Sequence, residues 1–207
     1  MKLTVVVIFF FLTIGARAQN YPFAKDFVRG TIVFKDSTKK EGQIKWYPAP
    51  GEKLKFRESE TGKTIKYTPE ELLGFYVDSL KFVSLFNFEV YAAQYALLGK
   101  KLTVKQTFVQ LLDSGRFNIY FGDVPEYNAL SGSVQSYPNF LFEKKTDSGY
   151  QYVAYPWAVR MRDKKYENAK ENLFVFFADY PEIIAKIKLF RQQDNFFEII
   201  DLMKKMN

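Results

Sequence analysis

Two kinds of hydrophobic spacing divide this chain, and together they constrain its fold more than any other feature. Between residues 28 and 67, apolar side chains alternate with polar ones, as at Ile44 and Trp46. A period of two is typical of strands with one buried face. After Pro156 the apolar spacing becomes three or four residues, which is typical of amphipathic helices. The sequence therefore predicts strands first and helices last.

The alternating segments are short and are separated by turn residues, which favours antiparallel pairing. We expect strands over residues 28–35, 43–46, 53–57, 64–67, 75–78, 81–86, 117–121, 139–145 and 150–155. Thr68 to Leu72 predicts a single helical turn that ends at Gly74. Residues 87–113 fit a strand or a helix equally well. Residues 122–138 contain Gly, Pro, Asn and Ser without periodicity, and they predict a long surface loop.

Three apolar stripes follow in the last third of the chain. The first stripe contains Tyr166, Ala169, Leu173, Phe176 and Phe177. Pro181 is expected to start a second helix, and Asp194 to cap a third. The predicted fold is therefore α+β: an antiparallel β-rich body, either a sandwich or an open barrel, followed by C-terminal helices that pack on the same domain. We divide the chain into residues 1–18, 19–156 and 157–207.

The first eighteen residues have the form of a secretory signal peptide. Lys2 provides the positive start, Leu3 to Ile14 is almost continuously apolar, and Ala16 and Ala18 stand at the positions that signal peptidase reads. The apolar run is too short to span a bilayer, which needs about 20 residues. We expect cleavage before Gln19 and a soluble periplasmic or extracellular protein without a transmembrane segment. A lipoprotein would need a cysteine at the new N-terminus, and the sequence has none.

The composition excludes much familiar chemistry. The sequence contains no cysteine and no histidine. Disulfides, thiol nucleophiles, Ser-His-Asp catalysis and imidazole-ligated metals are therefore excluded. We expect no metal and no cofactor. An exported chain of this kind must take its stability from its hydrophobic core.

Basic side chains form the most regular polar pattern in a chain whose formal net charge is +7. Lys45, Lys55, Arg57 and Lys66 occupy outward positions of the first strands, so we expect them on one solvent face. Such a face attracts polyanions, and an anionic envelope glycan is the partner that it predicts. The alternative is a charged face that maintains solubility and prevents edge pairing. Nucleic acid is not expected as a partner of an exported chain.

Three aromatic residues are candidates for ligand contact. Trp157 follows the last predicted strand, and with Tyr137 and Tyr127 from the predicted loop it could line a groove at one end of the sheet. The alternative is that Trp157 fills the junction between sheet and helices. Trp46 falls on the inward face by alternation, and we expect it in the core.

Paired carboxylates would allow glycoside hydrolysis if two of them stood about 5 to 9 Å apart. Glu89, Asp113, Asp123 and Glu126 are the candidates, because they lie near strand ends or in the predicted loop. The sequence alone does not bring any two of them together, and no catalytic residue is assigned.

Five segments of the chain carry a family resemblance: G-T-I-V-F-K-D, E-G-Q-I, Y-T-P-E-E-L-L-G-F-Y-V-D, G-R-F-N-I-Y and F-F-A-D-Y-P-E-I. They resemble a family of exported proteins of Gram-negative bacteria that have no established activity. The resemblance covers most of the chain after residue 18. It implies export and a β-rich body with C-terminal helices, and it supplies no site residue.

From these observations we interpret the chain as an exported, non-enzymatic binding protein of the envelope or extracellular space. Two alternatives remain open at this point. One is a small glycan-active hydrolase that uses two carboxylates. The other is an assembly or scaffold factor that binds protein partners.

Overall fold

Of the 207 residues of the chain, the computed structural model describes 21–48, 51–92, 100–128, 133–147, 149–156, 163–191 and 194–207. The strands are β1 (Val28–Phe34), β2 (Lys39–Lys45), β3 (Leu54–Arg57), β4 (Ile65–Tyr67), β5 (Leu72–Val77), β6 (Leu80–Ala92), β7 (Lys100–Asp113), β8 (Asn118–Asn128), β9 (Ser133–Thr146) and β10 (Gly149–Pro156). The helices are α1 (Pro22–Lys25), α2 (Asp163–Phe176), α3 (Pro181–Leu189) and α4 (Phe197–Met206).

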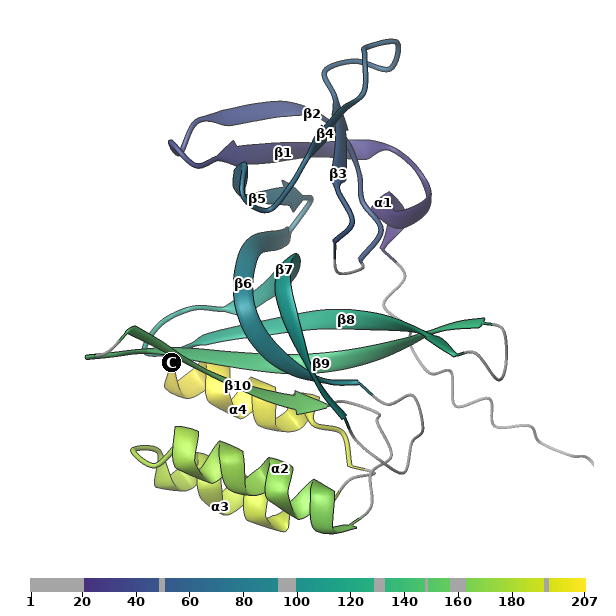
Figure 1. Cartoon of the computed structure of the whole chain (residues 1–207). Coiled ribbons are helices and arrows are strands. Elements are labelled where there is room, and N and C mark those ends of the chain that lie inside the picture. Colours follow the sequence, from purple (N-terminus) through teal and green to yellow (C-terminus); the bar gives the residue numbers. More distant parts are fainter. Residues whose placement is uncertain are drawn as a thin grey trace, which may run out of the picture.

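The strands form one continuous ten-stranded sheet in the order β10-β9-β8-β7-β6-β5-β1-β2-β3-β4. All neighbouring pairs are antiparallel. The sheet is strongly bent, so that β6 also contacts β8, β9 and β10 without being their hydrogen-bonded neighbour. The predicted α+β fold, with an antiparallel β-rich body and a helical segment at its end, is confirmed (Figure 1).

The bend separates two hydrophobic cores. The first core contains Tyr21, Phe23, Ile32, Ile44, Trp46, Leu54, Phe56, Leu72, Phe75, Val77, Phe82 and Phe108. The second core contains the buried side chains of β8, β9, β10, α2, α3 and α4, together with the later part of β6 and two residues of β7. Strands β6 and β7 contribute to both cores, and Figure 1 shows them connecting the upper and lower parts of the molecule.

Aromatic rings dominate the first core. Trp46 is 3% exposed and lies edge to face against Phe75, Phe82 and Phe108, with ring centroids 5.6, 5.7 and 5.6 Å away. The prediction that Trp46 is a core residue is confirmed. The predicted first hairpin is also confirmed, with Val28 opposite Ile44 and Ile32 opposite Lys40. No helix except the four-residue α1 packs on this core among the described residues.

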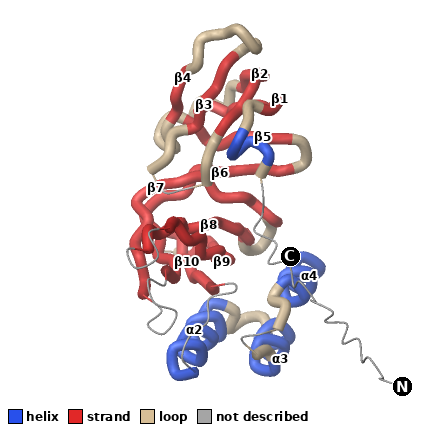
Figure 2. The backbone as a smooth tube through the Cα atoms, turned by 90° about the vertical axis from the view of Figure 1, so that its right-hand side faces the viewer, coloured by secondary structure: helices blue, strands red, loops and turns tan. Residues whose placement is uncertain are grey.

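The three C-terminal helices cover one face of β8, β9 and β10. Figures 1 and 2 both place them on the side of these strands that faces away from β1–β5. Phe142 meets Phe177 with ring centroids 5.3 Å apart, and Tyr155 stacks on Phe196 at 4.0 Å. The predicted apolar stripe is confirmed, because all five of its residues are buried. None of the helices in the described ranges is long and apolar enough to cross a membrane.

The prediction of a long loop over residues 122–138 was wrong. Strand β8 continues to Asn128 and β9 begins at Ser133, with residues 129–132 outside the described part. Beyond Phe121 the strand β8 pairs only with β9, and before Asn139 the strand β9 pairs only with β8. This segment is a two-stranded ribbon with two free edges, which is where a sheet tolerates proline. The prolines therefore do not interrupt the strands.

Three smaller expectations also need correction. The predicted helical turn at Thr68 is a non-helical turn, in which the Thr68 backbone N–H donates to Glu71 Oε2 at 2.7 Å. Gly74 does not end it but lies inside β5, where the Phe82 carbonyl approaches too closely for a Cβ. Asp194 does not cap α4: its carboxylate accepts from the Arg191 backbone N–H.

The ambiguous segment 87–113 is largely strand. Strand β6 runs to Ala92 and β7 starts at Lys100, while residues 93–99 lie outside the described part. Alternation is lost in β7 because Thr107, Phe108 and Val109 are all buried. A strand that is covered on both faces does not alternate, so periodicity could not distinguish it from a helix.

Candidate functional site

The predicted basic residues lie next to one another on strands β2, β3 and β4. Lys45 is directly opposite Lys55, and Lys55 is directly opposite Lys66. Residues opposite each other in antiparallel strands point to the same face, so the three side chains form one line across the sheet. In the described part of the chain, no carboxylate forms an ion pair with any of them. We call Lys45, Lys55, Lys66 and Arg57 the basic row.

Arg57 of the basic row is held by two side-chain contacts. Its Nε donates to Gln43 Oε1 at 2.7 Å, and its guanidinium carbon lies 4.2 Å from the centre of the Phe27 ring. A guanidinium that stacks on an aromatic ring keeps its remaining N–H groups available for a ligand. The sequence-based prediction that these four cations share a face therefore agrees with the register of the strands.

The predicted aromatic groove lies outside the described residues. Trp157 is not described, and Tyr137 is described only by its backbone, which pairs with Val124 in the ribbon of β8 and β9. The side chains of Tyr137 and Tyr127 are not described. Their role in ligand contact therefore stays a prediction.

The candidate carboxylates are not brought together where they are described. Glu89 is opposite Thr103 in the pairing of β6 with β7, ten residues along the same strand from Asp113. At about 3.3 Å per residue, the two acids are separated by roughly 30 Å measured along β7. Asp113 accepts instead from Asn207 Nδ2 at 2.9 Å. The side chains of Asp123 and Glu126 lie outside the described part.

Sequence reasoning missed a buried carboxylate, Glu143 on β9. It is 6% exposed and accepts three hydrogen bonds. Asn118 Nδ2 and Tyr120 Oη donate to Oε2 at 2.6 and 2.5 Å, and Tyr152 Oη donates to Oε1. The donors come from β8 and β10, the two neighbours of β9, because Asn118 and Tyr152 are the register partners of Glu143. An acid directly after the apolar run Phe140–Phe142 was the only signal for it in the sequence.

Burial and the Glu143 carboxylate keep the two phenols protonated. Burial raises the pKa of Tyr120 well above its usual value, and the hydrogen bond to Glu143 raises it further. The pKa of Tyr152 is raised by the same two causes in the same order. Both hydroxyls therefore remain hydrogen-bond donors to the Glu143 carboxylate throughout the physiological range.

The Glu143 cluster lines a cleft of about 430 Å³ between β6 and strands β8–β10. We call it the Glu143 cleft. Its lining residues are Lys81, Val83, Ser84, Leu85, Phe86, Leu111, Ser114, Asn118, Tyr120, Glu143, Tyr150 and Tyr152. Among the described residues that line this cleft, Glu143 is the only carboxylate. The size falls within the range of small-molecule sites, about 300 to 1,000 Å³.

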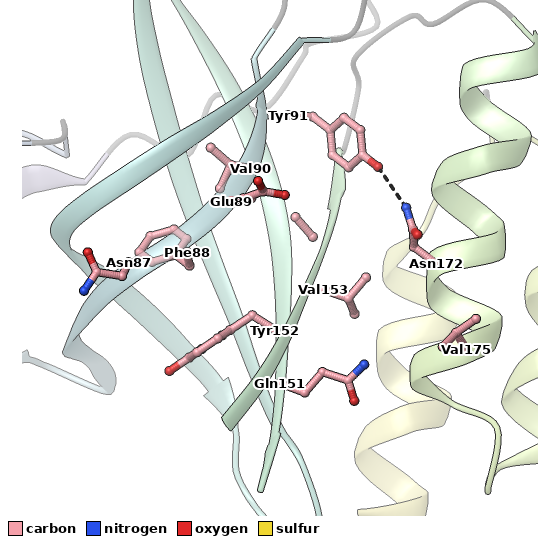
Figure 3. A pocket seen from close by; sticks show the side chains of 11 residues that line it. Asn87, Phe88, Glu89, Val90, Tyr91, Gln151, Tyr152, Val153, Asn172 and Val175 are labelled. Carbon is pink, nitrogen blue, oxygen red and sulfur yellow. Dashed lines mark hydrogen bonds between the residues drawn. The ribbon is translucent and has the colours of Figure 1, made fainter. Parts of the chain in front are cut away.

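A second hollow of about 310 Å³ lies between β6, the free edge of β10 and helix α2 (Figure 3). Tyr91 and Asn172 point toward each other across its upper end, with Tyr91 Oη 3.5 Å from Asn172 Nδ2. Tyr152 lines this hollow as well as the Glu143 cleft. Glu89 is the only carboxylate among the residues that line it.

The end of β6 is held beside this hollow by one buried side chain. Asn139 on β9 is fully buried, and its amide makes two bonds to the backbone of Tyr91. Asn139 Oδ1 accepts from the Tyr91 N–H and Asn139 Nδ2 donates to the Tyr91 carbonyl, both at 3.0 Å. The Asn139 amide thus makes the two backbone hydrogen bonds that a neighbouring strand would otherwise make with Tyr91, at the point where the bent sheet brings β6 over β9.

No group of three or more acidic side chains that could hold a metal ion occurs within the described residues. In comparisons with protein-family models, with curated proteins and with solved structures, nothing matched this chain. Functional inference therefore rests on the two sites described above, the basic row and the Glu143 cleft.

Proposed function

We propose that this chain is an exported, non-enzymatic binding protein of the envelope or extracellular space, and that it holds an anionic glycan on the basic row. The observation that carries the proposal is the register of β2, β3 and β4, which lines up Lys45, Lys55 and Lys66. None of the three forms an ion pair with an acidic side chain in the described ranges. Unpaired cations in one line attract a chain of repeating negative charges. Arg57, fixed on Phe27, adds a pre-positioned donor. Export rests on the signal-like first eighteen residues.

The alternative of a hydrolase with two carboxylates has less support. Each of the two hollows is lined by a single described carboxylate, Glu143 in one and Glu89 in the other. Glu143 is also engaged with three hydrogen-bond donors, which restricts it as a proton donor or nucleophile. Both carboxylates of such a mechanism have to face the same sugar ring.

The alternative of a scaffold factor that binds proteins through the helices also has less support. The apolar stripes of α2, α3 and α4 are buried in the second core and are not free for a partner. The exposed apolar side chains of this segment, Val175 and Leu189, lie on different helices.

Affinity chromatography on immobilised polygalacturonate tests the proposal. Reversal of three charges of the row, with Lys45→Glu, Lys55→Glu and Lys66→Glu, should abolish retention that the unaltered protein shows at low salt. Screening shortens the Debye length to about 8 Å at physiological ionic strength, so that retention should fall steeply with salt.

A matched control changes the same charge elsewhere. Lys186, Lys204 and Lys205 are exposed on α3 and α4, and their replacement by Glu should leave most of the retention in place. Equal losses in both triple variants would mean that only net charge matters, and the basic row would then be a device for solubility.

A further inference from the structure

We propose that the Glu143 cleft is a second binding site, which takes a small organic ammonium ion. This inference is independent of the glycan proposed for the basic row. The two sites lie on different parts of the sheet: the basic row is on β2–β4, and the Glu143 cleft is bounded by β6 and β8–β10.

The first argument is the missing counter-charge. Glu143 is 6% exposed, and its three partners are neutral donors, two phenols and one carboxamide. No lysine or arginine in the described ranges forms an ion pair with it. A buried carboxylate without a cation is costly, and buried charges are usually paired. A cationic ligand would supply the charge that the chain itself does not place there.

Lys81 is the one basic side chain among the described lining residues, and it lies beside another group. Its Nζ lies 6.0 Å from the centre of the Tyr76 ring on β5, the strand beside β6. It makes no ion pair with Glu143. The Glu143 carboxylate therefore lines the cleft without a counter-charge from Lys81.

The second argument is the free acceptor position on Glu143. An ionised carboxylate has about four positions at which it can accept hydrogen bonds. Oε2 already accepts from Asn118 and Tyr120, while Oε1 accepts from Tyr152 alone. One position on Oε1 is left, and an ammonium N–H is the donor that forms the strongest bond with it.

The third argument is the aromatic lining. Phe86, Tyr120, Tyr150 and Tyr152 all line the cleft. The faces of aromatic rings attract cations within about 6 Å, and this attraction grows when water is excluded. Tyr150 is 63% exposed at the edge strand β10, which makes it available to a ligand that enters from solvent. A buried carboxylate among several rings favours a ligand that combines a positive charge with apolar carbon.

Two probes of nearly equal shape test the charge directly. Benzylammonium carries the positive group, and benzyl alcohol replaces it with a neutral hydroxyl. Titration of the isotope-labelled full chain, followed by NMR, should show benzylammonium shifting the amide signals of residues 118–120, 143 and 150–152. Benzyl alcohol should bind at least tenfold more weakly. Equal binding of both probes, or no binding of either at 10 millimolar (on the order of the weakest specific affinities), would overturn the proposal.

Two variants separate the roles of charge and ring. Glu143→Gln keeps the shape of the side chain and should abolish the preference for benzylammonium. Tyr150→Ala changes an exposed residue and should weaken benzylammonium binding several-fold while the fold stays intact, so it gives an answer even if the Gln variant does not fold. Unchanged binding in Tyr150→Ala would contradict the aromatic contribution.

One further control keeps the two sites apart. The triple reversal of Lys45, Lys55 and Lys66 should leave benzylammonium binding unchanged, whether or not the glycan proposal holds. A neutral sugar such as N-acetylglucosamine should produce no shifts in residues 118–120 and 143. Shifts there with the sugar and not with benzylammonium would make the cleft a carbohydrate site and would refute the ammonium proposal.

Discussion

The two cores of this molecule are built differently although they share strands of one sheet. The first core lies against strands that have a solvated outer face and is closed by a four-residue helix. The second core is covered by three helices, and β6 crosses the opposite face of its strands. The first region exposes a regular polar face, which carries the basic row. The second region buries polar groups: the Glu143 cluster, and Asn139 with its two hydrogen bonds to the Tyr91 backbone. The basic row therefore results from the pattern of polar residues on a sheet surface, whereas the Glu143 cleft results from a buried hydrogen-bond network.

The largest expected effect comes from removing the helices. A chain that ends at Pro156 should aggregate, because it exposes Phe140, Phe142 and Tyr155 from the second core. The truncation also deletes the buried side chains of the helices themselves, such as Leu173, Phe177 and Ile200. Each large buried side chain contributes about 1.5 to 3 kcal/mol, so that the sum over the deleted segment exceeds the usual stability of a domain. Ile32 and Phe34 belong to the first core and are not part of the surface that the helices cover.

The truncated chain also shows whether the first core is autonomous. It retains Trp46 as its only tryptophan, since the other is Trp157. Because β6 and β7 belong to both cores, we expect Trp46 fluorescence to report loss of the first core as well. A soluble fragment that unfolds cooperatively would contradict this account of coupled cores.

The second prediction concerns the contact of Asn139 with the Tyr91 backbone, which forms because the bent sheet brings β6 over β9. Asn139→Ala removes both hydrogen bonds to the Tyr91 backbone, and each buried group left without a partner costs about 1 to 3 kcal/mol. Urea unfolding measures the change. Asn172→Ala is the matched control, because Asn172 is exposed and its contact with Tyr91 is long at 3.5 Å; it should change stability by less than about 0.5 kcal/mol. Equal losses of stability in the two variants would show that the hydrogen bonds of Asn139 do not hold β6 in place.

The third prediction is that the protein loses stability at alkaline pH because of buried tyrosines in the second region. Burial raises the pKa of Tyr120 and Tyr155 in the folded chain, while unfolded tyrosine titrates near pH 10. The folded state therefore holds these protons more tightly, so that their stabilisation is complete below about pH 10 and is lost as the pH rises further. The loss is up to about 1.4 kcal/mol per pH unit for each residue. Tyrosinate absorbance should show both phenols ionising only on unfolding. Their ionisation near pH 10 with the fold intact would contradict this.

The smallest effect is expected on the outer face of the first region. The triple reversal of Lys45, Lys55 and Lys66 should alter the free energy of unfolding by less than about 1 kcal/mol. Lys66 is exposed and Lys45 and Lys55 are half-buried on the solvent face, and charges in contact with water contribute little to stability. Thermal unfolding of the variant at moderate salt measures it. A larger loss would indicate that the row is part of the packing of the sheet, and the binding result for this variant would then lose its meaning.

Prediction from hydrophobic periodicity succeeded in the first region, where strands have one solvated face. It failed in the second region, where strands are covered on both faces. From β1 to β4 one face is solvated, so that Ile32, Ile44 and Trp46 alternate with polar residues and the register follows. In β7 both faces are covered and alternation disappears. In the ribbon of β8 and β9, proline and glycine suggested a loop, although free edges accommodate them.

The same difference explains what could be foreseen of the sites. The basic row was predictable because its members occupy equivalent positions of neighbouring short strands. Glu143 was not, because its partners Asn118 and Tyr152 come from two other strands and become neighbours only through the register. The resemblance to exported bacterial proteins and the signal peptide remain predictions, and residues 1–20 lie outside the described part.

The most direct test of the central claim is to locate bound polyanion on the molecule. NMR titration of the labelled chain with a short oligogalacturonate should shift amide signals of residues 43–45, 55–57 and 64–66, and the shifts should disappear as salt is raised. The signals of α2–α4 should stay in place. Shifts concentrated on the helices, or none at low salt, would contradict the assignment of anion binding to the basic row.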